Sequence, residues 1–228
     1  MKHSGKATQA AQKMIVKSLL LLLALAVAGV VARWLGSFIG AIVGTLLVLW
    51  AIFVAFVLYF FRDPDPVVPT DPKAIVSPAH GKVDLIDETT EPVFLGGPCR
   101  RVSIFLSVID VHVQNAPVAG RVAFLRHTRG QFLNAMRTDS AAHNENVLLG
   151  FESSEAPGEK VGVRLIAGLI ARRIVPWVNE GDPVARGERT SLIQFGSRVD
   201  CYLPLSATVC VQLGEHVKGG ETVLARRS

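Results

Sequence analysis

The chain has 228 residues, 50% of them hydrophobic, and a formal net charge of +5. Its basic residues are scattered rather than gathered in a stripe with aromatics, which argues against a nucleic-acid binder and for attraction to an anionic membrane surface. An odd number of cysteines without a CxxC spacing argues against a disulfide framework and a zinc site. We therefore expect a reducing compartment and three small core residues: Cys99, Cys201 and Cys210.

Two apolar runs predict a membrane-anchoring helical hairpin over residues 1–61. Phe38–Phe61 reaches the roughly 20 residues that cross the hydrocarbon core, and Ser18–Ala32 approaches that length once residues 14–17 are added. With four lysines before the first run and Arg62 after the second, the positive-inside rule places both flanks in the cytoplasm. The prediction is a protein of the inner cell membrane whose second domain lies on the cytoplasmic face.

The first run has an alternative interpretation as a secretory signal, because Ala26-Val27-Ala28 fits the small-residue cleavage pattern. A signal peptide is not normally followed at once by a longer apolar span, so the hairpin is favoured. Whether the hairpin crosses the bilayer or lies within one leaflet stays open.

Residues 62–228 have the composition of one soluble domain. Arg62–Pro72 holds four prolines in eleven residues and predicts an extended linker. Short runs rich in Val, Ile and Phe then alternate with Gly and Pro, which predicts a mainly β, short-stranded sandwich, with α+β as an alternative. Leu165–Ile174 fits helix or strand, and its Gly168 weakens the helix. The predicted strands are Lys82–Ile86, Val102–Leu106, Arg121–Leu125, Val147–Phe151, Val161–Ile166 and Leu192–Phe195.

An internal repeat predicts two pairs of tight turns. Val178–Glu188 aligns with Val211–Glu221 at an offset of 33 residues (211 − 178), and each copy reads Gly-acid-x-Val-x-x-Gly-Glu. Two such copies are similar to the paired hairpins of a biotinyl/lipoyl-like sandwich. A carrier of that kind would have a lysine at a hairpin tip, whereas this chain has Gly196-Ser197 between the copies.

The Gly196-Ser197 dipeptide is by itself most often a turn. Glycine, however, can adopt strained dihedrals that leave its carbonyl open to attack. Attack by the Ser197 hydroxyl would turn the peptide bond into an ester. Elimination would then leave dehydroalanine, which hydrolyses to a pyruvoyl group and ammonia.

Ordered motifs run along nearly the whole chain. Ser77–Val83 matches the family segment SPADGKV at every position but one, and Asp110–Gly120 resembles DVHVNRAPxxG. Together these motifs resemble phosphatidylserine decarboxylase in its short, membrane-bound proenzyme form. The others that follow the family order are Phe61–Pro64, Phe105–Ser107, Gly130–Ala135, Asn144–Asn146, Ile166–Ile174 and Phe195–Ser197.

The resemblance implies a pyruvoyl-dependent phospholipid carboxy-lyase that cuts itself between Gly196 and Ser197. A large chain, residues 1–196, would stay bound to a small chain of 32 residues (228 − 196) as a heterodimer, with further oligomerisation left open. The pyruvoyl group formed from Ser197 would bind phosphatidylserine as a Schiff base and accept the electrons released as CO₂ leaves. The product would be phosphatidylethanolamine, and no metal is implied.

Two histidines carry the implied acid–base chemistry. His112 matches the family histidine assigned to that work, and Asp110 would share its strand face. His80 stands where the family has an Asp thought to orient the histidine, and an imidazole offers no negative charge for that role. Three interpretations stay open: His80 is itself the base, another acid such as Asp84 or Asp110 replaces the missing one, or self-cleavage is impaired.

Candidates for substrate binding are weaker. Arg172 and Arg173 would hold a lipid phosphate bidentately, although a solvated membrane-facing patch explains them equally. Asn144 would contact the substrate or form a polar turn, and Asn115 stands where longer family members carry a second histidine. The remaining histidines have no partner at metal-ligand spacing and are predicted to be surface residues: His127, His143 and His216.

Two alternative functions remain. A serine-bearing ether lipid of the archaetidylserine type would serve the same chemistry. A non-cleaving membrane scaffold is the alternative if His80 abolishes self-cleavage. A lipoyl-type carrier is disfavoured, because the required lysine is missing.

Overall fold

Two apolar helices form the first of two units in the computed structural model of the chain. The structure describes residues 5–33, 37–133, 143–168, 173–194 and 196–227. The first unit, Gly5–Asp63, contains α1 (Lys6–Ala32) and α2 (Ser37–Phe60). Gly29 allows close approach, because an added Cβ would lie 3.3 Å from the Val43 side chain. Both helices are long and apolar enough to cross a bilayer, as is compatible with membrane association.

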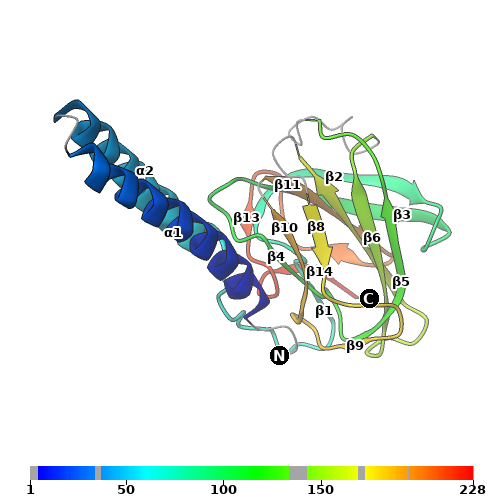
Figure 1. The fold of residues 1–228 in the computed structure, drawn as a ribbon. Helices are drawn as coiled ribbons and strands as arrows, with labels where there is room; N and C mark the ends of the chain where they lie inside the picture. The colour runs from blue at the N-terminus through cyan, green and yellow to red at the C-terminus, as the bar shows by residue number, and fades with distance from the viewer. Residues whose placement is uncertain (1–4, 34–36, 134–142, 169–172, 195, 228) are drawn as a thin grey trace. The chain divides into compact units, whose positions relative to one another are not determined.

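The second unit, which begins at Pro64, is mainly β, as the sequence predicts. An antiparallel sheet has the strand order β13-β2-β3-β11-β7-β6-β5-β9 and curls around the core, and two three-stranded sheets have the orders β1-β14-β12 and β4-β10-β8 (Figure 1). The strands are β1 (Ala74–Val76), β2 (Gly81–Glu91), β3 (Gly97–Leu106), β4 (Val113–Asn115), β5 (Gly120–Thr128), β6 (Asn146–Ser153), β7 (Lys160–Ala167), β8 (Arg173–Pro176), β9 (Pro183–Val184), β10 (Arg189–Gln194), β11 (Ser197–Leu203), β12 (Thr208–Val209), β13 (His216–Val217) and β14 (Val223–Arg226).

The predicted strand positions are confirmed, although several strands are longer than predicted. Every predicted run lies in β2, β3, β5, β6, β7 or β10, except that Phe195 falls outside the described residues. The ambiguous run Leu165–Ile174 belongs to strands at both ends, β7 and β8, and its residues 169–172 are also outside the described part.

The strand orders divide the β unit into two equivalent halves. The four strands β13-β2-β3-β11 correspond to β9-β5-β6-β7, and β1-β14-β12 corresponds to β4-β10-β8. The second half is continuous in sequence, from β4 to β10, and is inserted between β3 and β11 of the first half. Because of this insertion, β11 enters the sheet between β3 and β7, next to the axis that relates the halves.

The 33-residue repeat is confirmed as two matching pairs of turns. Gly181 and Gly187 in the first copy have φ of +93° and +74°, and Gly214 and Gly220 in the second have +87° and +72°. These are left-handed conformations that favour glycine. The repeat glycines therefore mark equivalent turns in the two halves.

A second repeat, of 39 residues (116 − 77), emerges from the structure. Ser77–Val83 and Ala116–Val122 occupy equivalent places in the two halves. Val83 accepts a backbone hydrogen bond of 2.8 Å from Gly214, just as Val122 accepts one of 2.7 Å from Gly181. The sequence analysis missed this repeat, because the two copies share only Pro, Gly, a basic residue and Val.

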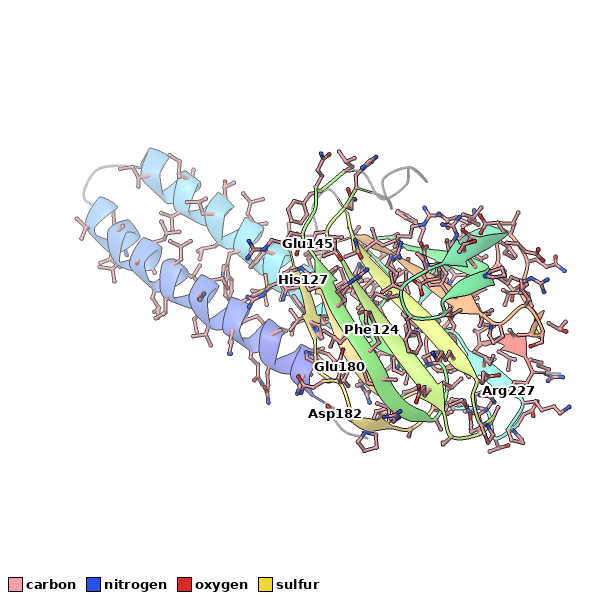
Figure 2. The ribbon with its side chains drawn as sticks, turned by 90° about the vertical axis from the view of Figure 1, so that its right-hand side faces the viewer. Phe124, His127, Glu145, Glu180, Asp182 and Arg227 are labelled. Atoms are coloured by element: carbon pink, nitrogen blue, oxygen red, sulfur yellow. The ribbon has the colours of Figure 1, made fainter. Side chains whose placement is uncertain are left out.

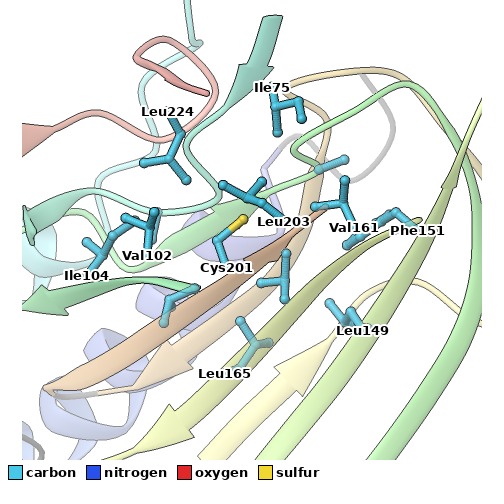
Figure 3. Packing of buried hydrophobic residues seen from close by; sticks show 14 of the residues in the cluster. Ile75, Val102, Ile104, Leu149, Phe151, Val161, Leu165, Cys201, Leu203 and Leu224 are labelled. Atoms are coloured by element: carbon cyan, nitrogen blue, oxygen red, sulfur yellow. The ribbon is translucent and has the colours of Figure 1, made fainter. Parts of the chain in front are cut away.

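Alternation along β11 decides which residues reach the core. Val199, Cys201 and Leu203 are buried with residues of β3 and β7 in one apolar cluster (Figure 3). Ser197 lies on the same face of the strand, at its beginning. Arg198 lies on the opposite face, nearly inaccessible to solvent, and binds Asp84 at 2.8 Å.

Two of the three cysteine predictions are confirmed. Cys99 and Cys201 are buried, whereas Cys210 is exposed, so the core prediction for Cys210 is wrong. Cys210 follows the two-residue strand β12, which pairs only with β14 and is therefore at the edge of its sheet.

The proline-rich linker packs against the repeat turns. As predicted, it contains no helix. An added Cβ at Gly187 would lie 2.5 Å from Val68, and one at Gly220 would lie 2.9 Å from Pro66. Glycine at these two turns thus allows the linker to lie directly on both repeat copies.

Candidate active site

Ser197 lies at the beginning of β11, between two paired strands. It is directly opposite Leu106 of β3 and Ala167 of β7, and its side chain is fully buried. Its hydroxyl has no hydrogen-bond partner among the described residues. Buried hydroxyl groups are usually bonded, so Ser197, like Ser103 on β3, is an exception that needs a structural or functional explanation.

Gly196 precedes this serine in a left-handed conformation, with φ of +71°. An added Cβ would meet nothing within 4 Å, so space does not require glycine here. The backbone conformation requires glycine instead, because L-residues with a side chain are strained at this φ. The Gly196–Ser197 peptide therefore joins a glycine in a conformation that other residues rarely adopt to a buried, unsatisfied hydroxyl.

His112 contacts the backbone nitrogen of Gly196, one peptide before the Gly196–Ser197 bond, from a segment 84 residues earlier. The ring is fully buried, with Nδ1 2.9 Å from the Asp110 carbonyl oxygen and Nε2 3.2 Å from the Gly196 backbone nitrogen. A carbonyl can only accept and a backbone N–H can only donate, so Nδ1 carries the proton and Nε2 accepts. The nitrogen that contacts Gly196 is therefore unprotonated.

Asp110 is a nearly buried carboxylate that shapes the turn before His112. One oxygen accepts hydrogen bonds from the backbone nitrogen and the hydroxyl of Ser107, at 2.8 and 2.6 Å. The other lies 2.9 Å from Nε2 of His216. Asp110 thus contacts His112 through its backbone carbonyl, while its carboxylate is engaged elsewhere.

The contact of His216 with Asp110 was missed by the sequence analysis. The His216 side chain is 61% exposed, as predicted for a surface residue, yet it binds a carboxylate 106 residues away. The sequence signal closest to this contact was the 33-residue repeat, which places residue 216 in a short strand near the site.

His80 and Asn115 meet at Gly219. A Cβ at Gly219 would lie 2.6 Å from Oδ1 of Asn115, 3.0 Å from Cδ2 of His80 and 3.2 Å from its Nε2. His80 is half-buried, and Nδ2 of Asn115 donates to the Gly187 carbonyl at 2.9 Å. Glycine at 219 therefore allows an imidazole and an amide to pack side by side.

Asn144 reaches the strand that faces Ser197. Its Nδ2 donates to the carbonyls of Ala167 and Leu133, at 2.7 and 2.9 Å, and its Oδ1 accepts from the Leu133 nitrogen at 2.8 Å. Both amide hydrogens are engaged, and Ala167 lies opposite Ser197. In this structure Asn144 therefore fixes the backbone beside the serine.

The arginine doublet is only partly described. Arg173 is exposed at the start of β8 and lies opposite Gln194 of β10, near the site, whereas Arg172 falls outside the described residues. Gln114 is an additional buried residue that the sequence analysis missed. It donates to the His112 carbonyl at 2.6 Å and accepts from the Ser191 hydroxyl at 2.9 Å.

Comparison with known proteins identifies the family. The family model for phosphatidylserine decarboxylase matches residues 53–225. The chain belongs to the phosphatidylserine decarboxylase family.

Two relatives of this decarboxylase family are similar over most of the chain, and both are named phosphatidylserine decarboxylase proenzyme. The protein from Desulfotalea psychrophila is 43% identical over 181 residues, which cover 79% of this chain and 84% of the relative. The protein from Erythrobacter litoralis is 48% identical over 182 residues, which cover 75% of this chain and 72% of the relative.

The match to the phosphatidylserine decarboxylase family encloses the whole candidate site. His80, His112, Asn115 and Ser197 lie within residues 53–225, whereas α1 lies outside them. Within the described part of the chain, no three His, Cys, Asp or Glu side chains are grouped to hold a metal ion. The family match therefore covers the predicted histidines and the serine together.

Proposed function

We propose that this member of the family decarboxylates phosphatidylserine to phosphatidylethanolamine after cutting itself between Gly196 and Ser197. The observation that carries the proposal is the buried, unpartnered Ser197 hydroxyl beside a peptide whose glycine contacts the unprotonated Nε2 of His112. This site suits a pyruvoyl group at position 197, which supplies a ketone that binds the substrate amine and accepts the electrons released with CO₂.

In the first step, the Ser197 oxygen attacks the Gly196 carbonyl carbon. His112 takes the hydroxyl proton at Nε2, the peptide C–N bond breaks, and the Ser197 nitrogen receives a proton, leaving an ester. Removal of the Ser197 α-proton then breaks the bond between Cβ and the ester oxygen. Gly196 leaves as a carboxylate, and water converts the dehydroalanine into the pyruvoyl group with loss of ammonia.

His112 has the protonation state that a general base requires, and its Nε2 lies one peptide away from the cleavage site. Its Nδ1–H donates to the Asp110 carbonyl, and Nε2 would exchange its contact with the Gly196 N–H for the Ser197 hydroxyl before taking the proton. After cleavage, the same Nε2 would hold the proton that the substrate carbon receives when CO₂ has left. The Asp110 carbonyl keeps the proton of His112 on Nδ1, so no carboxylate is needed to fix this tautomer.

For His80, the geometry favours a direct role in proton transfer. Of the acids considered as replacements, Asp84 is bound to Arg198, and the Asp110 carboxylate is engaged by Ser107 and His216. We infer that His80, packed beside Asn115, carries protons at the place where longer members have the second histidine.

The small chain, residues 197–228, would stay bound to residues 1–196 after cleavage. Its strand β11 lies between β3 and β7 and is hydrogen-bonded to both. Arg198 binds Asp84, and near the C-terminus Arg227 binds Glu159 at 2.7 Å. These contacts support a heterodimer that needs no covalent link.

For the membrane, we propose that residues 1–61 anchor the enzyme and that the catalytic domain, residues 62–228, lies on the cytoplasmic side of the inner membrane. Lys2, with Lys6, Lys13 and Lys17 in the N-terminal part of α1, and Arg62 after α2 support this orientation. Arg173, with Arg172, is the proposed contact for the lipid phosphate, because guanidinium groups bind phosphate bidentately.

Incubation with serine lipids tests the proposed function. The purified full chain is incubated with phosphatidylserine and, separately, with a serine-bearing ether lipid, and ethanolamine lipids are quantified by mass spectrometry. The proposal expects product from phosphatidylserine, abolished by borohydride reduction in the presence of substrate. A chain that stays uncut and forms no product, while His80→Asp is cut and active, would show that His80 prevents maturation.

A further inference from the structure

Large aliphatic side chains are exposed at one end of the β unit. In the part of this unit that the structure describes, the exposed ones are Val67, Val108, Ile109, Leu133, Leu205 and Leu213. Four of these, Val108, Ile109, Leu133 and Leu213, belong to three loops next to Ser197; we call them the apolar rim. Ile109 and Leu213 are the most exposed of the rim, at 63% and 64%. Exposed aliphatic groups that cluster around a site indicate a surface that is covered in use.

A polar residue of the site connects each loop of the rim to the centre. Ile109 precedes Asp110, whose carbonyl binds His112. The turn that contains Leu213 leads into His216, which binds the Asp110 carboxylate at 2.9 Å. The apolar loops are therefore held around the site by the residues that shape it.

The loop of Leu133 is connected on the other side of Ser197. The Leu133 backbone is bonded twice to the Asn144 side chain, and Asn144 also binds Ala167, opposite Ser197. Leu205, by contrast, follows the far end of β11, and its side chain is 41% exposed. It provides a control away from the site, with an exposure close to that of Val108 and Leu133, at 41% and 39%.

Basic side chains accompany the rim. Lys82 on β2, Arg129 before the Leu133 loop and Arg173 opposite Gln194 are exposed at the same end. Aliphatic tips with Lys and Arg nearby are typical of surfaces that enter the headgroup region of an anionic bilayer, and here the acids Asp84 and Glu215 are exposed at the same end.

We propose that the apolar rim contacts the surface of a bilayer that contains anionic phospholipid and delivers the lipid amine to position 197. The proposal rests on the proposed function, because a lipid substrate explains why a buried site needs a membrane-facing opening. The bilayer is preferred to a second protein because the rim surrounds the lipid's reaction centre and α1 and α2 are long enough to hold the chain in the same membrane.

Spin labels test the contact without measuring activity. Cys210→Ser removes the exposed thiol, and burial raises the pKa of the Cys99 and Cys201 thiols, so neither competes for the label. Single cysteines at positions 109, 213 and 205 are labelled in the full chain and reconstituted in vesicles of phosphatidylglycerol and phosphatidylcholine. Oxygen concentrates in the bilayer, so it should relax the labels at 109 and 213 more than a water-soluble nickel chelate does. The label at 205 should be relaxed mainly by the chelate.

Two results would overturn the proposal. Nickel relaxation at 109 and 213 equal to that at 205 would show that the rim faces water. Protection from both reagents, with spin–spin broadening between chains, would show that a second copy covers the rim.

Activity provides the second test. Leu213→Asp should lower kcat/KM for phosphatidylserine in vesicles about tenfold more than kcat/KM for a monomeric short-chain phosphatidylserine. Leu205→Asp should leave the ratio of the two unchanged. Equal losses on both substrates would contradict membrane delivery. Failure of the unsubstituted chain to act on either substrate would instead refute the proposed function, whatever the spin labels report.

Discussion

The two halves of the β unit place the same backbone arrangement at two ends of this unit, with very different side chains. In the first half, Leu106 of β3 pairs with Ser197 of β11. In the corresponding place of the second half, the backbone N–H of Ser153 donates to the backbone carbonyl of Glu159 at 3.0 Å. We call the first the catalytic end, formed by His80, His112, Asn115, Gly196 and Ser197. The second is the locked end, formed by Ser153, Glu155, Glu159, Arg186 and Arg227.

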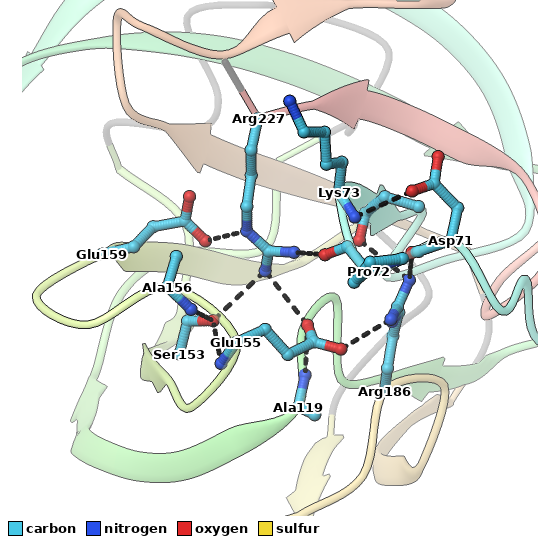
Figure 4. A network of polar contacts seen from close by, with 11 residues as sticks. Asp71, Pro72, Lys73, Ala119, Ser153, Glu155, Ala156, Glu159, Arg186 and Arg227 are labelled. Carbon is cyan, nitrogen blue, oxygen red and sulfur yellow. Dashed lines mark hydrogen bonds and ion pairs between the residues drawn. The ribbon is translucent and has the colours of Figure 1, made fainter.

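The locked end is tied together by ion pairs (Figure 4). Arg227 binds Glu159 at 2.7 Å and Glu155 at 3.1 Å, and Arg186 also binds Glu155, at 2.5 Å. Both arginines are nearly buried, with side chains 8% and 9% exposed. Charged groups at this end are therefore paired, and they join the last strand to the loop between β6 and β7.

The corresponding positions at the catalytic end carry small or neutral groups. Arg186 corresponds to Gly219 by the 33-residue offset, and Ala119 corresponds to His80 by the 39-residue offset. Glycine in place of arginine leaves room for His80 and Asn115, and the serine hydroxyl stays unpartnered. The comparison teaches that one backbone plan is used for stability where its polar groups are satisfied and for chemistry where they are not.

Removing the serine hydroxyl should abolish the chemistry of the catalytic end. Ser197→Ala has no oxygen for attack on Gly196, so no small chain and no ethanolamine lipid should form, as measured by gel and lipid mass spectrometry. Glu159→Ala, at the corresponding place of the locked end, should still be cut. Cleavage of Ser197→Ala at this bond would show that another nucleophile acts.

Removing the proposed base should slow self-cleavage strongly. His112→Ala should lower the cleavage rate by about 10²–10⁴-fold, the usual contribution of general base catalysis, in a time course of small-chain formation. The matched control is His127→Ala, because His127 is another histidine near a carboxylate, 3.2 Å from Glu145 (Figure 2). A normal cleavage rate in His112→Ala would exclude it as the base.

Breaking the locked end should cost stability rather than chemistry. Arg227→Met leaves Glu155 and Glu159 with fewer partners, which should destabilise the fold by about 3–5 kcal/mol in thermal unfolding. The small chain should still form at the normal bond. An Arg227→Met protein that unfolds normally but is not cut would reverse the roles assigned to the two ends.

Filling the space at Gly219 should disturb the catalytic end moderately. Gly219→Ala puts a Cβ 2.6 Å from Asn115 and 3.0 Å from His80, so both side chains must move. We expect about a tenfold loss in decarboxylation, since small displacements of catalytic groups are costly. Gly97→Ala, where an added Cβ meets nothing within 4 Å, should be neutral.

The smallest expected effect concerns the support of the base. His216→Ala removes one of three contacts to the Asp110 carboxylate, and the His216 side chain is largely exposed. We expect a loss of about two- to fivefold in kcat with little change in KM. His216→Gln keeps an N–H donor and should recover most of that loss; an equal loss in both variants would exclude a hydrogen-bonding role.

Local patterns predicted much of this fold. The helical hairpin, the linker, the strand positions and the 33-residue repeat depend on composition or on turn residues close in sequence, and the structure agrees with each. The 39-residue repeat was not predicted, because few residues are shared between its copies. The exposure of Cys210 was not predicted either, since it depends on β12 being an edge strand.

The site was predicted through motifs, and its geometry was not. The sequence indicated Ser197, His112 and His80, but not that the His112 ring contacts the Gly196 nitrogen through Nε2. The contact of His216 with Asp110 joins residues 106 positions apart, and no local pattern encodes it. The use of Gly219 to seat His80 likewise depends on turns that meet only in the folded chain.

The most direct test of the catalytic end is the intact mass of the full chain purified from membranes. The account predicts two chains, residues 1–196 ending in a free Gly196 carboxylate and residues 197–228 beginning with a carbonyl group that borohydride reduces. A single 24.6 kDa chain with an unmodified Ser197 would contradict it.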